Sequence, residues 1–275
     1  MPPDNYFTVI VQSITELLTR HSDMFVAMGG NLFRGFAIIL ISWFGAKVAL
    51  SSSHEQHSFH FGNFASLLLT IAFGFAMITY YDSPIPGFGV SFKNLILDQS
   101  HYLARRIEVS TIEEIQQRLT EVYVTMERPT LLRGVYIVHY FLILCAIILA
   151  QMAVFAVIAF GYVAMAVIVL VGPIFIPFFI VPHMEWMFWG WLRAFIQYSF
   201  YQVVANAFVF VFAQLLLHFL DLFPPPFDSA TISILFVQLV FLLLSFVYGV
   251  LKIPSLVNSI FSGRSGESAL PRAIG

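Results

Sequence analysis

The sequence predicts an all-α bundle of about five to six membrane-spanning helices, with one amphipathic helical segment near the middle of the chain. The first observation is composition, because 59% of the 275 residues are hydrophobic and 10% are charged, whereas soluble domains carry about 25% charged residues. The second is distribution. The formally charged residues between Arg133 and Lys252 are only Glu185, Arg193, Asp221 and Asp228. A segment of this kind needs a solvent that accepts apolar surface, which is the lipid bilayer.

Residues 1–31 form the first predicted segment, and residues 5–19 within it have the pattern of an amphipathic helix. The apolar side chains at helical spacing are Phe7, Ile10, Val11, Ile14, Leu17 and Leu18. Such a helix packs on the bundle or lies in the membrane interface. The sequence favours neither alternative.

Residues 32–81 form the second segment and hold the first two predicted spans, 32–50 and 64–81. At about 1.5 Å per residue the first span is roughly 29 Å long, which is close to a hydrocarbon thickness of about 30 Å. Tyr80 and Tyr81 end the second span, where aromatic side chains are expected to lie at the membrane interface.

The third segment, residues 82–134, is the longest polar stretch. It opens on the breaker cluster Asp82-Ser83-Pro84-Ile85-Pro86-Gly87, which predicts a turn. A mixed-charge amphipathic helix follows over residues 103–126, and its polar face is expected to dock partner subunits. The candidate docking residues are Arg105, Arg106, Glu113, Glu114 and Arg118.

Residues 135–251 form a hydrophobic transmembrane bundle, and residues 252–275 form a polar tail. The predicted spans of the bundle cover residues 135–159, 161–181, 192–220 and 232–251. The second of these is broken, because proline removes a backbone donor and clashes with the preceding turn. The break is either a structural kink or a discontinuous helix at a channel or binding site, since bare backbone at membrane depth must face protein or water.

Polar side chains at roughly helical spacing follow one side of span 192–220. Polar groups inside spans hold helices together or line a polar pathway. Together with the proline break they are our candidates for a pore lining or a subunit interface. These candidates are Gly172, Pro173, Pro177, Arg193, Gln197, Tyr201, Gln202 and Asn206.

Lysine and arginine are distributed unevenly among the predicted loops. In the six-span interpretation one side holds Arg20, residues 82–134, Arg193 and the tail, while the opposite loops, at 51–63, near 160 and at 221–231, hold none. Cytoplasmic loops carry an excess of Lys and Arg. This interpretation therefore places both termini in the cytoplasm.

The sequence predicts no catalytic residue and no metal site. His54, His57 and His60 bring imidazoles together in one loop, as zinc and copper sites do, but their spacing matches no metal motif. A membrane enzyme built on this cluster is one alternative. A stand-alone small-solute transporter or channel is another, and it would need a midplane site and internal symmetry. We expect no cofactor apart from bound phospholipid.

Three stretches of the chain together resemble one family. They are Leu32-Phe33 through Trp43-Phe44-Gly45, Tyr80 through Phe92, and Gly172-Pro173-Ile174-Phe175 through Phe188-Trp189-Gly190-Trp191-Leu192 to Tyr198, with Ile253-Pro254-Ser255-Leu256 closing the pattern. Over about residues 5–262 the chain is similar to the TrbL-type inner-membrane subunit of bacterial type IV secretion systems, the polytopic channel component of conjugation machines. The shared order of these hydrophobic motifs carries the resemblance.

The resemblance implies a structural, non-enzymatic, multi-pass subunit of the bacterial inner membrane. It implies a homo-oligomeric ring, described as five-fold for the family, on which pilin and a minor pilin assemble. Other inner-membrane secretion subunits, membrane lipids and transiently the transferred DNA are the further partners it implies. It also implies a cytoplasmic C-terminus, in agreement with the Lys/Arg count. The resemblance further implies a periplasmic N-terminus, a periplasmic segment 82–134 and an odd number of spans. On these points it disagrees with the Lys/Arg count, which places the N-terminus and this segment on the cytoplasmic side.

Overall fold

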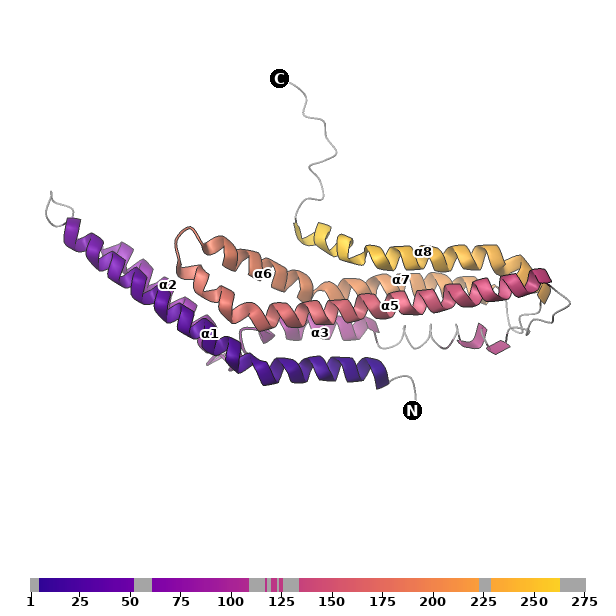
Figure 1. Cartoon of the computed structure of the whole chain (residues 1–275), viewed down its shortest axis with the longest axis horizontal. Coiled ribbons are helices and arrows are strands. Elements are labelled where there is room, and N and C mark those ends of the chain that lie inside the picture. The colour runs from indigo at the N-terminus through magenta and orange to yellow at the C-terminus, as the bar shows by residue number, and fades with distance from the viewer. Residues whose placement is uncertain are drawn as a thin grey trace, which may run out of the picture. The chain divides into compact units, whose positions relative to one another are not determined.

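The structure is a computed structural model, and it describes residues 5–51, 61–108, 117, 120–122, 124–125, 134–222 and 229–262. Regular structure within these residues is helical. The elements are α1 (Asn5–Ser51), α2 (Phe61–Thr79), α3 (Asn94–Glu108), α5 (Gly134–Phe175), the 3-10 helix η1 (Ile176–Ile180), α6 (Glu185–Ser199), α7 (Tyr201–Asp221) and α8 (Ser229–Ser262), as Figure 1 shows.

Five helical stretches of the described chain have the length and apolar composition needed to cross a membrane. They are Arg20–Leu50, Phe61–Thr79, Val135–Ile180, Glu185–Asp221 and Ile234–Phe261. The predicted fold class, an all-α polytopic membrane bundle of about five to six spans, is therefore confirmed.

The chain divides into two compact units. Unit 1 comprises Met1–Gln99 and Tyr162–Ser199, and unit 2 comprises Ser100–Gly161 and Phe200–Gly275. Each unit is therefore built from two separate stretches of sequence. The five segments predicted from hydropathy follow chain order instead, and they stay a prediction.

Helix α1 is continuous where two separate helices, 5–19 and 32–50, were expected. The sequence between them contains Gly29 and Gly30 but no proline, so each backbone N–H can still donate within the helix. Glycine weakens a helix without ending it. The expected separation at this point was wrong.

Helix α5 is also continuous, and it merges the expected spans 135–159 and 161–181 into one helix up to Phe175. The expected loop near residue 160 was wrong because no proline or polar cluster is present there. Gly161, the one breaker residue there, allows the side chains of Tyr201 and Gln202 on α7 to pack closely against α5. The predicted break does occur, but it follows Pro173, where α5 gives way to η1.

The expected span 192–220 is divided between two helices. α6 ends at Ser199 and α7 begins at Tyr201, so Phe200 lies at the junction and the two helices belong to different units. α8 extends past the expected end at residue 251 and carries Pro254 inside it.

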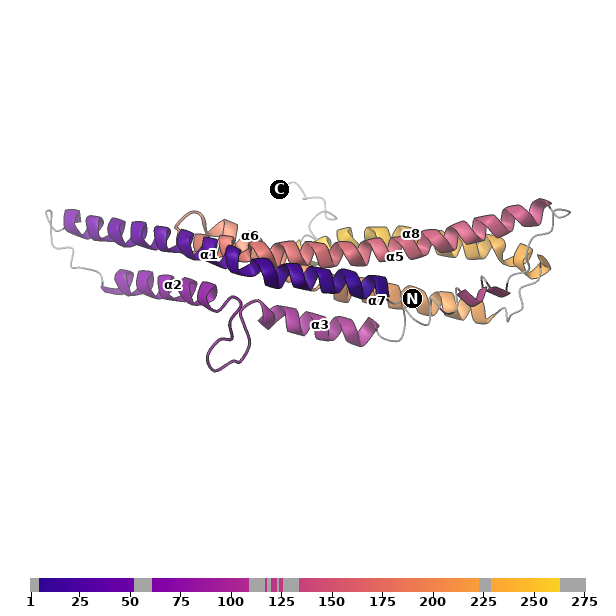
Figure 2. The ribbon, with the colours of Figure 1, turned by 60° about the horizontal axis from the view of Figure 1, so that its bottom comes forward.

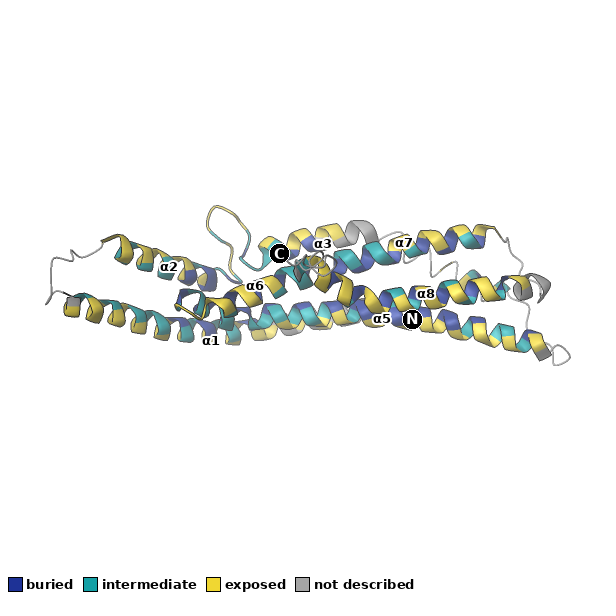
Figure 3. Cartoon of the chain, turned by 90° about the horizontal axis from the view of Figure 1, so that it is seen from above, coloured by how far each residue is buried: buried dark blue, intermediate teal, exposed yellow. Residues whose placement is uncertain are grey.

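The core of unit 1 lies where α1, α2 and η1 meet α6. Its buried side chains include Phe33 from α1, Ile78 from α2, Ile176 and Ile180 from η1 and Phe188 from α6. α1 and α2 run side by side in both Figure 1 and Figure 2. Exposed and half-buried residues outnumber buried ones on these two helices, as Figure 3 shows. The outer faces of α1 and α2 therefore need lipid or another chain to cover them.

The core of unit 2 is formed mainly by α7 and α8. The rings of Phe212 and Phe246 lie 5.0 Å apart between centroids. Gly249 of α8 faces the Phe208 ring, which a Cβ at this position would approach to 3.1 Å at Cε1. Glycine here allows the two helices to pack closely, as small residues commonly do in membrane bundles.

Candidate functional site

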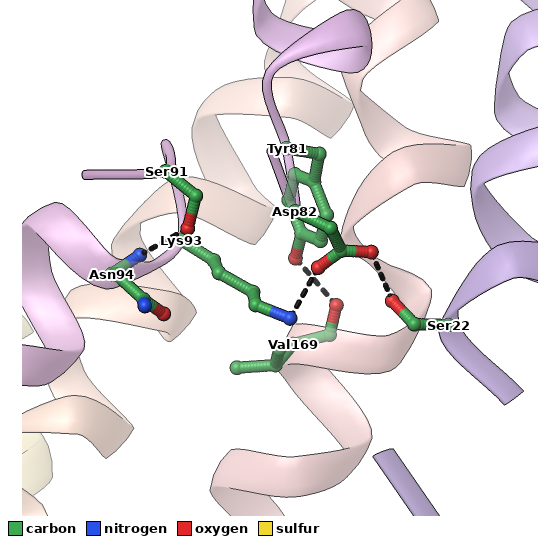
Figure 4. A network of polar contacts seen from close by, with 7 residues as sticks. All are labelled: Ser22, Tyr81, Asp82, Ser91, Lys93, Asn94 and Val169. Carbon is green, nitrogen blue, oxygen red and sulfur yellow. Dashed lines mark hydrogen bonds and ion pairs between the residues drawn. The ribbon is translucent and has the colours of Figure 1, made fainter. Parts of the chain in front are cut away.

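The proline in α5 leaves one backbone acceptor without its usual donor. Pro173 has no N–H, so the carbonyl of Val169, four residues earlier, receives no hydrogen bond from it. The phenol of Tyr81 donates to the Val169 carbonyl oxygen at 2.5 Å instead, and Tyr81 has no exposed surface (Figure 4). A side chain 88 residues away in the sequence thus supplies the bond that the proline removes.

A second side chain reaches the adjacent carbonyl of the same helix. The indole Nε1–H of Trp191, in α6, donates to the carbonyl oxygen of Ile168 at 2.9 Å. Trp191 is buried and stacks on Phe195, with ring centroids 5.6 Å apart. Two aromatic donors, one from the end of α2 and one from α6, therefore cover adjacent carbonyls just before the break.

Gly172 makes room for both aromatic rings. A Cβ at this position would lie 2.6 Å from Trp191 Cζ2 and 2.9 Å from Tyr81 Cζ. Real Cβ atoms essentially never approach carbon so closely, so any larger residue would push the two rings away from the carbonyls. Packing therefore requires glycine at residue 172, and Pro173 is the reason that the Val169 carbonyl needs a side-chain donor.

A second close approach covers the other side of the break. Pro177, at the start of η1, has no N–H to donate to the Pro173 carbonyl, and both prolines are buried. Gly29 of α1 lies directly over that carbonyl, since a Cβ on Gly29 would come within 2.6 Å of the Pro173 carbonyl carbon. The predicted break is therefore enclosed by protein of unit 1.

A polar cluster holds the Tyr81 corner in place. Ser22 of α1 donates to the Asp82 carboxylate, and Lys93 forms an ion pair with the same carboxylate (Figure 4). The loop between Asp82 and Lys93 closes on itself, because the Phe92 amide donates to the Tyr80 carbonyl at 2.9 Å. Gly87 and Gly89 have φ values of 88° and 72°, a region that favours glycine.

The electrostatics of this corner keep the phenol protonated. Burial raises the pKa of Tyr81 above its usual range, and the neighbouring Asp82 carboxylate raises it further. Tyr81 lies beyond the end of the span Phe61–Thr79. The expectation that Tyr81 belongs to an interfacial aromatic belt was wrong, because its ring is buried in the protein core.

Unit 2 contains a smaller polar contact of the same kind. The buried Gln202 of α7 donates through Nε2 to the carbonyl oxygen of Ile158 in α5 at 3.0 Å. A Cβ on Gly161 would come within 2.7 Å of Gln202 Nε2 and of Tyr201 Cε1. Tyr201 also meets Phe160 edge to face, with centroids 6.0 Å apart. Gly161 therefore lets α7 approach α5.

The structure divides the polar stripe predicted along span 192–220. Tyr201, Gln202 and Asn206 are buried within unit 2, whereas Arg193 is exposed and Gln197 is half-buried on α6 of unit 1. Gly172 lies against Tyr81 and Trp191, and Pro173 lies against Gly29. A role of these residues in a pore lining or subunit interface stays a prediction.

The candidate docking residues of the central segment are only partly described. Arg105 and Arg106 lie on α3, and Glu113, Glu114 and Arg118 lie outside the described residues. His54, His57 and His60 lie outside them as well. Within the part of the chain that the structure describes, no group of three or more His, Cys, Asp or Glu side chains has a geometry suited to a metal ion.

Sequence reasoning missed the residues that enclose the break. A proline inside a helix indicates that the carbonyl four residues earlier needs a new donor, so Val169 was identifiable. Tyr81, Trp191 and Gly29 were not, because nothing in the local sequence links them to Pro173. The same holds for Ser22 and Lys93 beside Asp82.

Unit 2 also carries an open groove of about 390 Å³ between α7 and α8. Its lining is largely apolar, with Leu215, Phe241 and Leu242, and His218, Gln238 and Ser245 add polar atoms.

Comparison with known families identifies the chain. A family model described as TrbL/VirB6 plasmid conjugal transfer protein matches residues 37–253. No significant match was found among curated proteins. The matched range contains the break at Pro173, its partners Tyr81 and Trp191, and the Gln202 contact. The chain, a multi-pass helical membrane protein, belongs to the TrbL/VirB6 family of plasmid conjugal transfer proteins.

Proposed function

We propose that this chain is a structural subunit of a bacterial type IV secretion system, forming an oligomeric inner-membrane platform for substrate translocation and pilus assembly. The observation that carries the proposal is the family match over residues 37–253 on a chain with five candidate membrane spans. The subunit acts by assembly and carries out no catalysis.

The geometry of the proline break supports a scaffold over a stand-alone transporter. A transporter needs a cavity near the midplane where polar groups converge on a solute. At the break of α5 the polar groups of Tyr81 and Trp191 instead converge on backbone carbonyls of the same chain. These hydrogen bonds hold unit 1 in one conformation. A subunit on which other subunits dock requires such a fixed conformation.

Five candidate spans in the described residues, an odd number, support a topology with the two termini on opposite sides of the membrane. We place the C-terminus in the cytoplasm, because Arg264 and Arg272 follow the end of α8 and Lys252 lies in its last turns. The N-terminus and the segment 82–134 then lie in the periplasm, as the resemblance implies. The six-span interpretation with both termini in the cytoplasm is set aside.

The partners follow from the proposed platform. Pilin, a minor pilin and other inner-membrane secretion subunits dock on it, with α3 and the charged residues that follow it as the proposed docking segment. Transferred DNA makes transient contact. Phospholipid occupies the groove between α7 and α8, supported by its apolar lining and polar rim.

Affinity purification of the tagged chain from a conjugating cell, in mild detergent, tests the proposal. The gene for the chain is first deleted, and the resulting loss of conjugal transfer shows that the chain is needed. The tagged copy must then restore transfer. Imaging the purified particle then gives its symmetry and partners. A ring of several copies with other secretion subunits supports the platform. A functional particle with one or two copies and no partner refutes it.

A further inference from the structure

The loop between α2 and α3 contains ten consecutive residues without a charged side chain. Residues 83–92 include two phenylalanines, two glycines and two prolines, and proline has no backbone N–H that needs an acceptor. The charged residues on either side of this stretch, Asp82 and Lys93, form an ion pair with each other. The loop therefore presents no unpaired charge to its surroundings.

The two phenylalanines of the loop have opposite surroundings. Phe88 lies at the tip and is 75% exposed. Gly87 and Gly89 on either side of it have positive φ values, which let the chain reverse sharply. Phe92, at the other end of the loop, packs against the core of unit 1, with its ring centroid 6.4 Å from that of Tyr81. One ring thus fixes the loop to its unit, and the other stays uncovered.

The backbone of the loop satisfies much of its own hydrogen bonding. The Ile85 amide donates to the Val90 carbonyl oxygen at 2.9 Å. The amides of Phe88 and Gly89 both donate to the Ile85 carbonyl oxygen at 3.1 Å. Backbone groups in contact with lipid must find their partners within the protein. This loop can therefore lie against lipid at a smaller cost than a loop with an open backbone.

The length of α2 determines the depth of the loop. The candidate span Phe61–Thr79 has 19 residues, which is roughly 29 Å at about 1.5 Å per residue and leaves no excess over a hydrocarbon core of about 30 Å. The base of the loop, where the Phe92 amide meets the Tyr80 carbonyl, therefore lies at the membrane boundary. The loop leaves α2 on the side opposite α1, and its tip leans back toward α2 (Figure 2 and Figure 3). The tip thus lies at the depth of the interface.

We propose that the loop between Asp82 and Lys93 anchors unit 1 in the lipid interface, with Phe88 inserted between the head groups and the acyl chains. Phenylalanine is typical of elements that lie in this interface, where apolar side chains enter by about 5–10 Å. The exposed side of α2, with Leu69 and Phe73, already needs an apolar environment, and the loop continues from the end of that helix. Asp82 also accepts a hydrogen bond from α1, so the anchor fixes the depth of both helices.

A fluorescent label on a single cysteine measures the surroundings of the tip. The full-length chain, with Cys145 replaced by alanine, carries an NBD fluorophore at Phe88→Cys in vesicles of phosphatidylethanolamine and phosphatidylglycerol. Quenching by a lipid with a nitroxide high on its acyl chain is compared with quenching by aqueous iodide. Leu69→Cys on α2, 70% exposed, is the lipid reference, and Asp98→Cys, exposed on α3, is the water reference. The lipid-to-iodide ratio at residue 88 should exceed that at residue 98 by about tenfold, as burial of one phenylalanine side chain supports.

A label away from the tip tests whether Phe88 itself holds the loop in lipid. Ser83→Cys, at an exposed residue near the start of the loop, carries the label while Phe88 stays in place. Adding Phe88→Ser should lower the lipid-to-iodide ratio at residue 83 by about threefold or more, whereas Phe88→Trp should keep it. Three results would each overturn the anchor: equal ratios at residues 88 and 98, protection of residue 88 from both quenchers by another protein, or no change at residue 83 after Phe88→Ser. The proposed platform would stand in each case, because the anchor rests on the membrane span alone.

Discussion

The bond between Tyr81 and the Val169 carbonyl provides the sharpest test of the structure. Tyr81→Phe keeps the ring and removes the one hydroxyl that donates to this buried acceptor. Pro173 cannot replace the donor, so the carbonyl stays unsatisfied. A buried polar group left without a partner costs about 1–3 kcal/mol, and hydrogen bonds in membrane bundles average about 0.6 kcal/mol. We expect a loss of about 1–2 kcal/mol, because the site is fully enclosed.

Equilibrium unfolding of the purified chain in mixed micelles measures this loss. Tyr80→Phe, at the neighbouring half-buried tyrosine, is the control and should stay within about 0.5 kcal/mol of wild type. The decisive comparison uses Pro173→Ala, which returns an N–H four residues after Val169. In that background Tyr81→Phe should cost clearly less, so the two substitutions should show a favourable coupling. An equal cost in both backgrounds would refute the argument that Tyr81 replaces the donor that proline removes.

Three further predictions concern other parts of the molecule. The pKa of Tyr81 is raised in the folded state, so the contribution of Tyr81 to the unfolding free energy should be complete below about pH 10. Above that pH it should decline by up to about 1.4 kcal/mol per pH unit. The difference in unfolding free energy between wild type and Tyr81→Phe should therefore shrink when it is measured from pH 8 to 11. Gly172→Leu should displace both aromatic donors, lower the unfolding free energy by more than about 2 kcal/mol and abolish conjugal transfer. Gly45→Leu is the control, because a Cβ at Gly45 meets nothing within 4 Å, and it should leave the unfolding free energy and conjugal transfer near wild type. Reversing the charges of Glu113 and Glu114 should reduce recovery of the secretion complex several-fold while the amount of inserted protein stays constant; unchanged recovery, seen by co-purification, would count against docking through this segment.

The fold class was predictable because it depends on composition. Four charges between Arg133 and Lys252 leave no alternative to a membrane bundle, whereas the helix separations expected between residues 19 and 32 and near residue 160 are absent. Helix ends were harder to predict. Gly161 has the local pattern of a boundary, yet α5 runs through it. The reason for the glycine is the approach of Gln202, which lies in another helix.

The proline break shows the same limit at the candidate site. Its position could be read from Gly172-Pro173, since the loss of an N–H is a local property of the chain. Whether the break faced water or protein depended on Tyr81, Trp191 and Gly29, which lie far from it in the sequence. Local patterns identify which backbone group needs a partner, and only the tertiary structure identifies the partner.

The separation between Tyr81 and Val169 has a consequence for biosynthesis. A ribosome adding about 5–20 residues per second needs roughly 4–18 s to pass from one to the other, because they are 88 residues apart. During this time α1 and α2 have been made, but the stretch Tyr162–Ser199 that completes their unit has not. The first two spans must therefore remain in the membrane with their inner faces uncovered until Trp191 arrives. Insertion factors that shield a helical hairpin are expected to matter most in this interval.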